Sequence, residues 1–141
     1  MLSKHKGNLI LVLYDISDQI LELLIKNRKG VLSLCDLKEI SDKCAKYLSR
    51  NRELLSFLEL TRLNVSAAKY LSKSNGNSIR FSKLKTISDE VVGVLSDFEG
   101  EIRLEGIKKL SLKASRFLAN HKGDLWLGLT ECRDDLLDLL L

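Results

Sequence analysis

Apolar residues recur along this chain in a block pattern with a period of about 23 residues, the spacing of Gly7 and Gly30 and of Gly100 and Gly123. Each block begins with an apolar–x–apolar triplet, such as LSL at 32–34 or IRL at 102–104. Two further apolar residues follow each triplet. The second of them stands directly before a polar residue. In the first five blocks this polar residue is Ser17, Ser41, Asn64, Ser88 and Ser111. Because these positions agree over six consecutive blocks, the pattern indicates an array of structural repeats.

Each block predicts one strand followed by one helix. Alternation within the triplet is typical of a strand with one buried face. The serine or asparagine stands where a helix N-cap belongs, because its side-chain oxygen can accept a backbone N–H of the first turn. Apolar residues then follow at helical spacing, as Cys44, Ala45 and Leu48 do. A crossover of about 20 residues through a helix requires parallel strands, so we expect one parallel sheet.

Two details of the repeats give more specific expectations. Phe57 and Phe81 occupy the inner triplet position of adjacent blocks, and we expect them to pack against each other in the core. Basic residues before a glycine, as in HKG at 121–123 and 5–7, suit a helix end at which glycine takes the left-handed cap conformation. The first seven residues therefore resemble the end of a repeat whose beginning is absent.

The period also decides between architectures. One unit has too few apolar residues to fold alone, so stacking of neighbouring units must supply the stability. Helical-hairpin repeats need about 34 to 47 residues, and the observed period is too short for two helices and their turns. We expect one domain over residues 1–141, with about five to six repeats and incomplete repeats at both ends.

The segments LSLCDLKEIS at 32–41 and IRFSKLKTIS at 79–88 resemble bacterial leucine-rich repeats, and the resemblance extends from Leu2 to about Leu140. It implies a right-handed α/β horseshoe segment, with short parallel strands on the concave face and helices on the convex face. In that family the concave face usually binds another macromolecule. The family's asparagine column is occupied here by Leu37, Leu60 and Leu84. The chain therefore resembles a variant that lacks the asparagine ladder.

The triplet residues that point away from the core, and their neighbours, form the predicted concave surface. In the last three units they are Arg80, Arg103, Trp126, Glu101, Glu105 and Asp124. In the first three units the apolar ones are Ile10, Val12, Val31, Leu54 and Leu58. Arginines beside an exposed tryptophan are typical of binding hot spots, and exposed apolar area on a sheet indicates contact with another molecule. The alternative is a solvated face on which the arginines and acids satisfy one another.

Composition and motifs exclude several functional classes. The net charge is +4, and the 23 basic residues are interleaved with 19 acids, which does not favour a nucleic-acid groove. The chain has no phosphate-binding loop, nucleophile elbow or HExxH motif. Cys35, Cys44 and Cys132 fall in three different columns, and His5 and His121 fit helix ends. We therefore expect no catalytic residues, no metal site and no cofactor.

Targeting features are also missing from the sequence pattern. The longest apolar stretch, at 9–14, is far below the roughly 20 residues that span a bilayer. Neither a signal-peptide pattern nor an even-numbered cysteine framework occurs, so the default compartment is the cytoplasm.

The sequence thus predicts a non-enzymatic recognition module that binds a protein through the concave face of the repeat array. The alternative is a structural spacer in a larger multidomain protein, with no ligand of its own. The uncapped ends, with Leu136, Leu139 and Leu140 in core columns, predict either a piece of a longer array or end-to-end self-association between copies.

Overall fold

Strands and helices alternate along the whole described part of the chain. The structure is a computed structural model that describes residues 7–12, 17–26 and 31–131. The strands are β1 (Leu9–Val12), β2 (Leu32–Cys35), β3 (Leu54–Phe57), β4 (Ser78–Phe81), β5 (Glu101–Leu104) and β6 (Leu125–Leu127). The helices are α1 (Asp18–Ile25), α2 (Asp42–Leu48), α3 (Val65–Ser72), α4 (Asp89–Leu95) and α5 (Leu112–Ala119).

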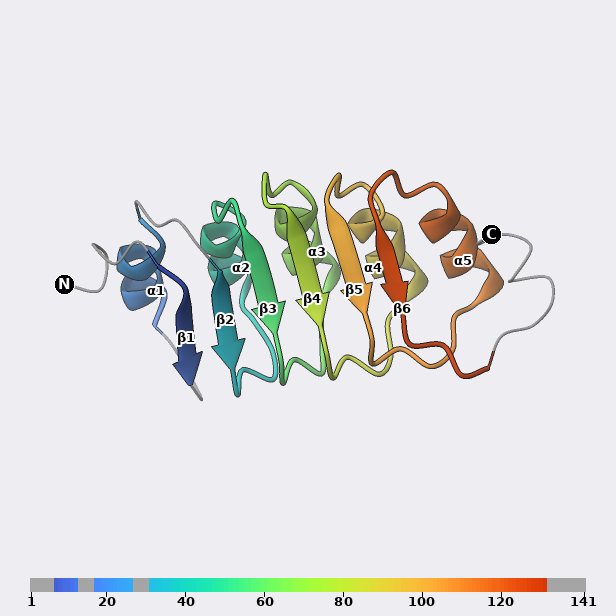
Figure 1. The fold of residues 1–141 in the computed structure, drawn as a ribbon, viewed down its shortest axis with the longest axis horizontal. Coiled ribbons are helices and arrows are strands. Elements are labelled where there is room, and N and C mark those ends of the chain that lie inside the picture. The colour runs from blue at the N-terminus through green and yellow to red at the C-terminus, as the bar shows by residue number, and fades with distance from the viewer. Residues whose placement is uncertain (1–6, 13–16, 27–30, 132–141) are drawn as a thin grey trace.

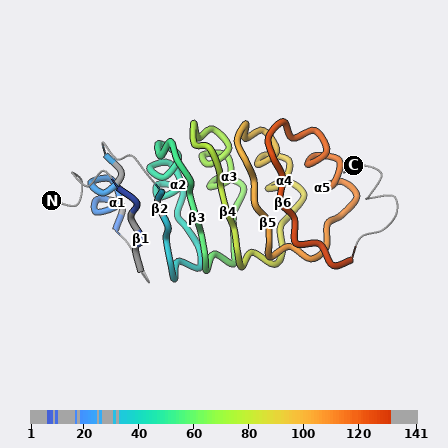
Figure 2. Tube along the Cα trace, viewed as in Figure 1, coloured from blue at the N-terminus to red at the C-terminus, as the bar shows by residue number. Residues whose placement is uncertain are grey.

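The strands form one parallel sheet in which they follow chain order from β1 to β6. The helices form a second layer behind the sheet (Figure 1). Figure 2 shows the same repeated path, in which each unit lies beside the previous one. The register pairs corresponding triplets, for example Leu55 with Ile79 and Ile79 with Ile102. The predicted strand–helix units and the mixed α/β architecture with a parallel sheet are therefore confirmed.

The helices begin where the sequence predicted. All five described helices have the expected serine or asparagine as N-cap, and its side chain accepts a backbone N–H three residues later. Asn64, for example, accepts from Ala67 at 2.7 Å. This bond satisfies one of the backbone donors that the first helical turn leaves unpaired.

The core lies between the two layers. The inner triplet residues of the central strands are almost fully buried, with Phe57 and Phe81 at 1% and 0% exposure. Their rings stack with centroids 5.3 Å apart and an interplanar angle of 9°, which confirms the predicted contact. The leucines that follow the triplets are buried as well, as Leu60 and Leu84 show. Apolar packing thus extends from these strands into the turns that follow them.

The predicted left-handed glycine caps are wrong. The C-cap residues of the described helices are Lys26, Ser49, Lys73, Ser96 and Asn120. Gly100 and Gly123 come later, just before a strand, and neither has a left-handed φ. A Cβ atom on Gly100 would lie 2.5 Å from the carbonyl oxygen of Asn77. These glycines therefore allow the loops of successive units to approach each other closely.

Some expectations concern residues outside the described ranges. They include His5, Cys132 and the leucines at 136, 139 and 140, so the predicted end-to-end contact stays a prediction.

Candidate functional site

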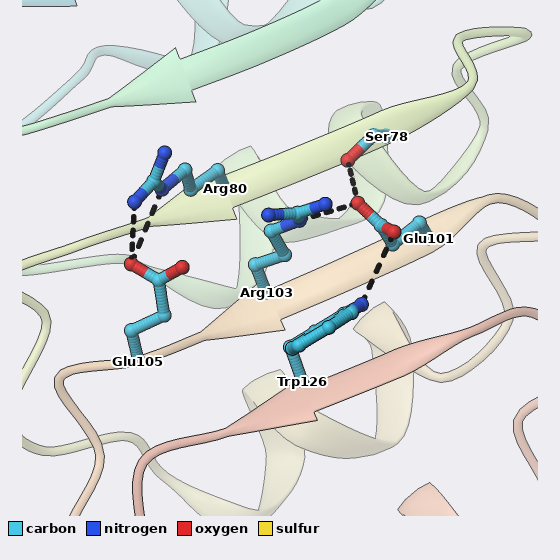
Figure 3. A network of polar contacts seen from close by, with 6 residues as sticks. All are labelled: Ser78, Arg80, Glu101, Arg103, Glu105 and Trp126. Atoms are coloured by element: carbon cyan, nitrogen blue, oxygen red, sulfur yellow. Dashed lines mark hydrogen bonds and ion pairs between the residues drawn. The ribbon is translucent and has the colours of Figure 1, made fainter.

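The last three strands place a row of three large side chains on the face of the sheet opposite the helices. Arg80 on β4 pairs in register with Arg103 on β5, which pairs with Trp126 on β6. The neighbouring residues on each strand, such as Ile102 and Leu104, point into the core. Because side chains alternate between the two faces of a strand, burial of these neighbours directs the row outward. Figure 3 shows the row with its polar contacts.

Trp126 is held in place although it is 55% exposed. The guanidinium carbon of Arg103 lies 5.0 Å from the centroid of its ring, a cation–π contact. The indole Nε1 donates a hydrogen bond of 3.2 Å to Oε2 of Glu101 (Figure 3). Two contacts from β5 therefore fix the orientation of an exposed aromatic side chain on β6.

Glu101 is the central acceptor of this site. It also accepts a hydrogen bond from Nε of Arg103 and one of 2.8 Å from Oγ of Ser78. The hydrogen bond from Arg103 is the main reason why the pKa of Glu101 is lowered from its ordinary value of 4.5. The same bond raises the pKa of the Arg103 guanidinium. Glu101 is therefore a carboxylate at neutral pH, bound by donors on three strands.

Arg80 has a separate acidic partner. Its Nε and Nη2 donate to Oε2 of Glu105, at 3.2 and 2.9 Å. Glu105 follows β5 and lies diagonally across from Arg80, a distance that long side chains can span. Among the described residues, Nη1 of Arg80 and both Nη groups of Arg103 have no hydrogen-bond partner. These groups remain available as donors, while the other bonded N–H groups of the two arginines donate to the two glutamates.

We define the Arg–Trp cluster as Ser78, Arg80, Glu101, Arg103, Glu105 and Trp126, the residues drawn in Figure 3. Five of them were expected on this face from the sequence. Ser78 was not singled out as a functional residue. It could have been found from its column, because it pairs in register with Glu101.

Asp124 does not join the cluster. It is exposed and precedes β6, and its backbone oxygen accepts a hydrogen bond of 2.9 Å from the N–H of Ile102. In the described part of the chain its carboxylate has no hydrogen bond or ion pair. Asp124 therefore contributes to the sheet through its backbone oxygen and adds no side-chain contact to the cluster.

The other half of this face is less open than the sequence suggested. Val31, Leu54 and Leu58 are half-buried rather than exposed. Ser33 and Ser56, which occupy the row itself, are only 8% and 6% exposed. A short side chain lies low between longer neighbours, so water reaches it less than its outward position implies.

Two further positions of that half were expected to be exposed. Ile10 is exposed, at 68%, and the side chain of Val12 lies outside the described residues. Leu54 pairs in register with Ser78 and so adjoins the Arg–Trp cluster. The apolar half is a low surface of serines and half-buried leucines beside the cluster.

Other potentially reactive groups are dispersed. Cys35 is half-buried and Cys44 is buried. Nδ1 of His121 lies 3.2 Å from the carbonyl oxygen of Ser96, the C-cap of α4, which places this ring at a helix end. Within residues 7–12, 17–26 and 31–131, no three His, Cys, Asp or Glu side chains are grouped closely enough to hold a metal ion. None of the helices in these ranges has the length and apolar character that crossing a membrane requires.

Comparisons of the chain with models of protein families, with curated proteins and with solved structures found no match.

Proposed function

We propose that this chain is a leucine-rich-repeat-like recognition module, without enzymatic activity, that binds a protein partner through the sheet face of β4, β5 and β6. The observation that carries the proposal is Trp126, which is 55% exposed and yet held by Arg103 and Glu101. Tryptophan and arginine dominate the binding energy of many protein interfaces. A side chain that is already oriented loses less conformational freedom on binding, which favours affinity.

The leucine-rich-repeat assignment is supported by the repeated strand–helix unit and by the buried leucines that recur with it. Such arrays present one continuous sheet face, and extended faces of stacked repeats are used for macromolecular binding. The departure at the asparagine column is compatible with this assignment, because buried leucines such as Leu60 and Leu84 pack there instead.

The chemistry of the Arg–Trp cluster favours binding over catalysis. Glu101 has a lowered pKa and accepts three hydrogen bonds. A general acid or base at neutral pH needs a pKa near the working pH and access to the substrate proton. Glu101 therefore suits a structural role in positioning Arg103 and Trp126.

A spacer without a ligand is the competing function. It is favoured by the ion pairs Arg80–Glu105 and Arg103–Glu101, because charges that pair with each other need no external partner. A spacer has no need of an oriented and exposed tryptophan, and for this reason we favour recognition.

Affinity capture with the whole chain as bait tests the proposal. Wild-type bait and a Trp126→Ala/Arg103→Ala bait, matched in amount and in thermal stability, are compared by quantitative mass spectrometry. We expect a partner that the wild type retains and the double variant loses. Equal recovery of every retained protein by both baits would contradict binding through this face.

A further inference from the structure

We infer that the partner of this face presents an aspartate or glutamate side chain, within an extended peptide segment, to the guanidinium groups of Arg80 and Arg103. The inference rests on the proposed function and names the chemistry of its partner. It follows from the arrangement of the two arginines and from those of their N–H donors that make no hydrogen bond among the described residues.

The two guanidinium groups stand on neighbouring strands at positions that pair directly in register. Neighbouring strands are about 4.8 Å apart, so two like charges directly opposite each other destabilise the pair. Glu105 bonds to Arg80 beyond one end of β5, and Glu101 bonds to Arg103 at the other end. The acids therefore lie at opposite ends of the pair of arginines, as Figure 3 shows.

The donors that remain are suited to a carboxylate. Among the described residues, Nη1 of Arg80 and both Nη groups of Arg103 make no hydrogen bond. Arg80 and Arg103 have side chains that are 38% and 33% exposed, so a ligand can reach them. A guanidinium binds a carboxylate through charge-assisted hydrogen bonds, and an anion placed beside both groups also reduces their mutual repulsion.

The surroundings favour a single carboxylate over a polyanion. Glu101 and Glu105 flank the arginines along the strand direction, and a phosphate backbone that followed this direction would meet them. Across the strands, the neighbours are apolar or uncharged. They are buried Ser56 and half-buried Leu54 on one side and Trp126 on the other.

These neighbours define the rest of the segment. A peptide that crosses the strands would place its acidic residue over the arginines and apolar residues on both sides. One side would contact Leu54 and Leu58, and the other would contact the ring face of Trp126 that Arg103 leaves uncovered. The preferred segment is therefore an acidic residue between apolar or aromatic residues.

A peptide array tests this inference with the whole chain. The probes are acetylated decapeptides of random sequence, and the chain and its Trp126→Ala variant are each passed over the same array. Peptides retained only by the wild type are then made again with each acid replaced by its amide. Because the chain has a single tryptophan, the fluorescence of Trp126 reports binding at the site itself.

We expect the retained peptides to be enriched in aspartate or glutamate, and the amide versions to bind at least about tenfold more weakly. Arg80→Gln should remove most of this difference. Arg116→Gln, the same change at an exposed position on α5 in the helix layer, should preserve it.

Two results would overturn the inference in distinguishable ways. If neutral or basic peptides are retained and change the Trp126 fluorescence, the acidic partner is wrong while binding through this face stands. If no peptide distinguishes the wild type from Trp126→Ala, both the acidic partner and binding of peptides by this face are rejected.

Discussion

Three side chains of the Arg–Trp cluster are positioned through Glu101, which bonds to Ser78, Arg103 and Trp126. Glutamine keeps the shape of this side chain, removes its charge and turns one of its two accepting oxygens into an NH2 donor, so Glu101→Gln tests the ion pair together with one side of the hydrogen-bond network. Its side chain is only 21% exposed, so the hydrogen bonds are partly shielded from water. At the scale of single residues, Glu101→Gln is therefore the most informative change.

The lowered pKa of Glu101 predicts a specific dependence of stability on pH. Since the pKa is lower in the folded chain than its ordinary value of 4.5, folding stabilises the ionised form. This stabilisation is complete above the ordinary pKa and is lost as the pH falls through the lowered value. We expect the difference in unfolding free energy between the wild type and Glu101→Gln to be larger at pH 7 than near pH 2.

Urea unfolding of both proteins at the two pH values measures this difference. The change in unfolding free energy between the two pH values is measured for each protein, and the two changes are then compared. The effect of the other carboxylates cancels in this comparison, because they protonate in both proteins. A difference that is the same at pH 7 and near pH 2 would show that the Glu101 ion pair makes no pH-dependent contribution.

At the scale of elements, two adjacent residues of β4 face opposite sides of the sheet, one in the core and one on the surface. Phe81 is fully buried and stacks on Phe57, whereas Arg80 is partly exposed and pairs with Glu105. Phe81→Ala should cost about 3–5 kcal/mol of unfolding free energy, as large core truncations do. Arg80→Ala should cost less than about 1 kcal/mol, because exposed ion pairs contribute little.

Chemical denaturation of the two variants, with the same protocol, checks this contrast. Losses of equal size would mean that the inside and outside faces of β4 have been assigned wrongly.

The loops before the strands must approach the loops of the preceding units closely. A Cβ on Gly100 would lie 2.5 Å from the carbonyl oxygen of Asn77 and 2.7 Å from the ring of Phe98. We expect Gly100→Ala to lower the unfolding free energy by about 1–3 kcal/mol through overpacking.

Gly93→Ala is the matched control. In α4 its Cβ would lie 3.2 Å from the ring of Phe117, a less severe contact, and alanine favours the helix by about 1 kcal/mol. Its thermal unfolding should stay near that of the wild type. A Gly100→Ala protein as stable as Gly93→Ala would show that the loops can separate without cost.

The elements also show which features were predictable from sequence. The N-caps and the register followed from one period, because each unit repeats the same local requirement, as Ser41 and Asn64 illustrate. The glycine caps were predicted wrongly because the closest contact of Gly100, with the carbonyl oxygen of Asn77, comes from the preceding unit and is not visible in the residues around Gly100. Burial of Ser33 and Ser56 depends likewise on the length of neighbouring side chains.

The sequence predicted which residues of the candidate site lie in one row, but not which hydrogen bonds they form. Parallel register alone brings Arg80, Arg103 and Trp126 together. The choice of Glu101 as the shared acceptor depends on side-chain conformations, since Glu105 and Asp124 have the same charge nearby. Sequence columns cannot rank such alternatives, because they contain no distances.

At the scale of the whole molecule, stacking of the units creates a surface that no single unit has. Each residue of the row belongs to a different unit, and its strands β4, β5 and β6 lie side by side in the sheet (Figure 1). The central claim is that this composite surface binds a protein and that Arg103 and Trp126 act together in doing so.

A double-mutant cycle on a partner retained by the wild-type chain tests this claim most directly. Titration calorimetry gives the Kd for the wild type, Trp126→Ala, Arg103→Ala and the double variant, with thermal melts of each in parallel. We predict weaker binding in both single variants at nearly unchanged stability. The loss in the double variant should be less than additive, because the two side chains are in contact, with Cζ of Arg103 5.0 Å from the ring centroid of Trp126. Unchanged affinity in both single variants would contradict the claim and exclude the Arg–Trp cluster as the binding site.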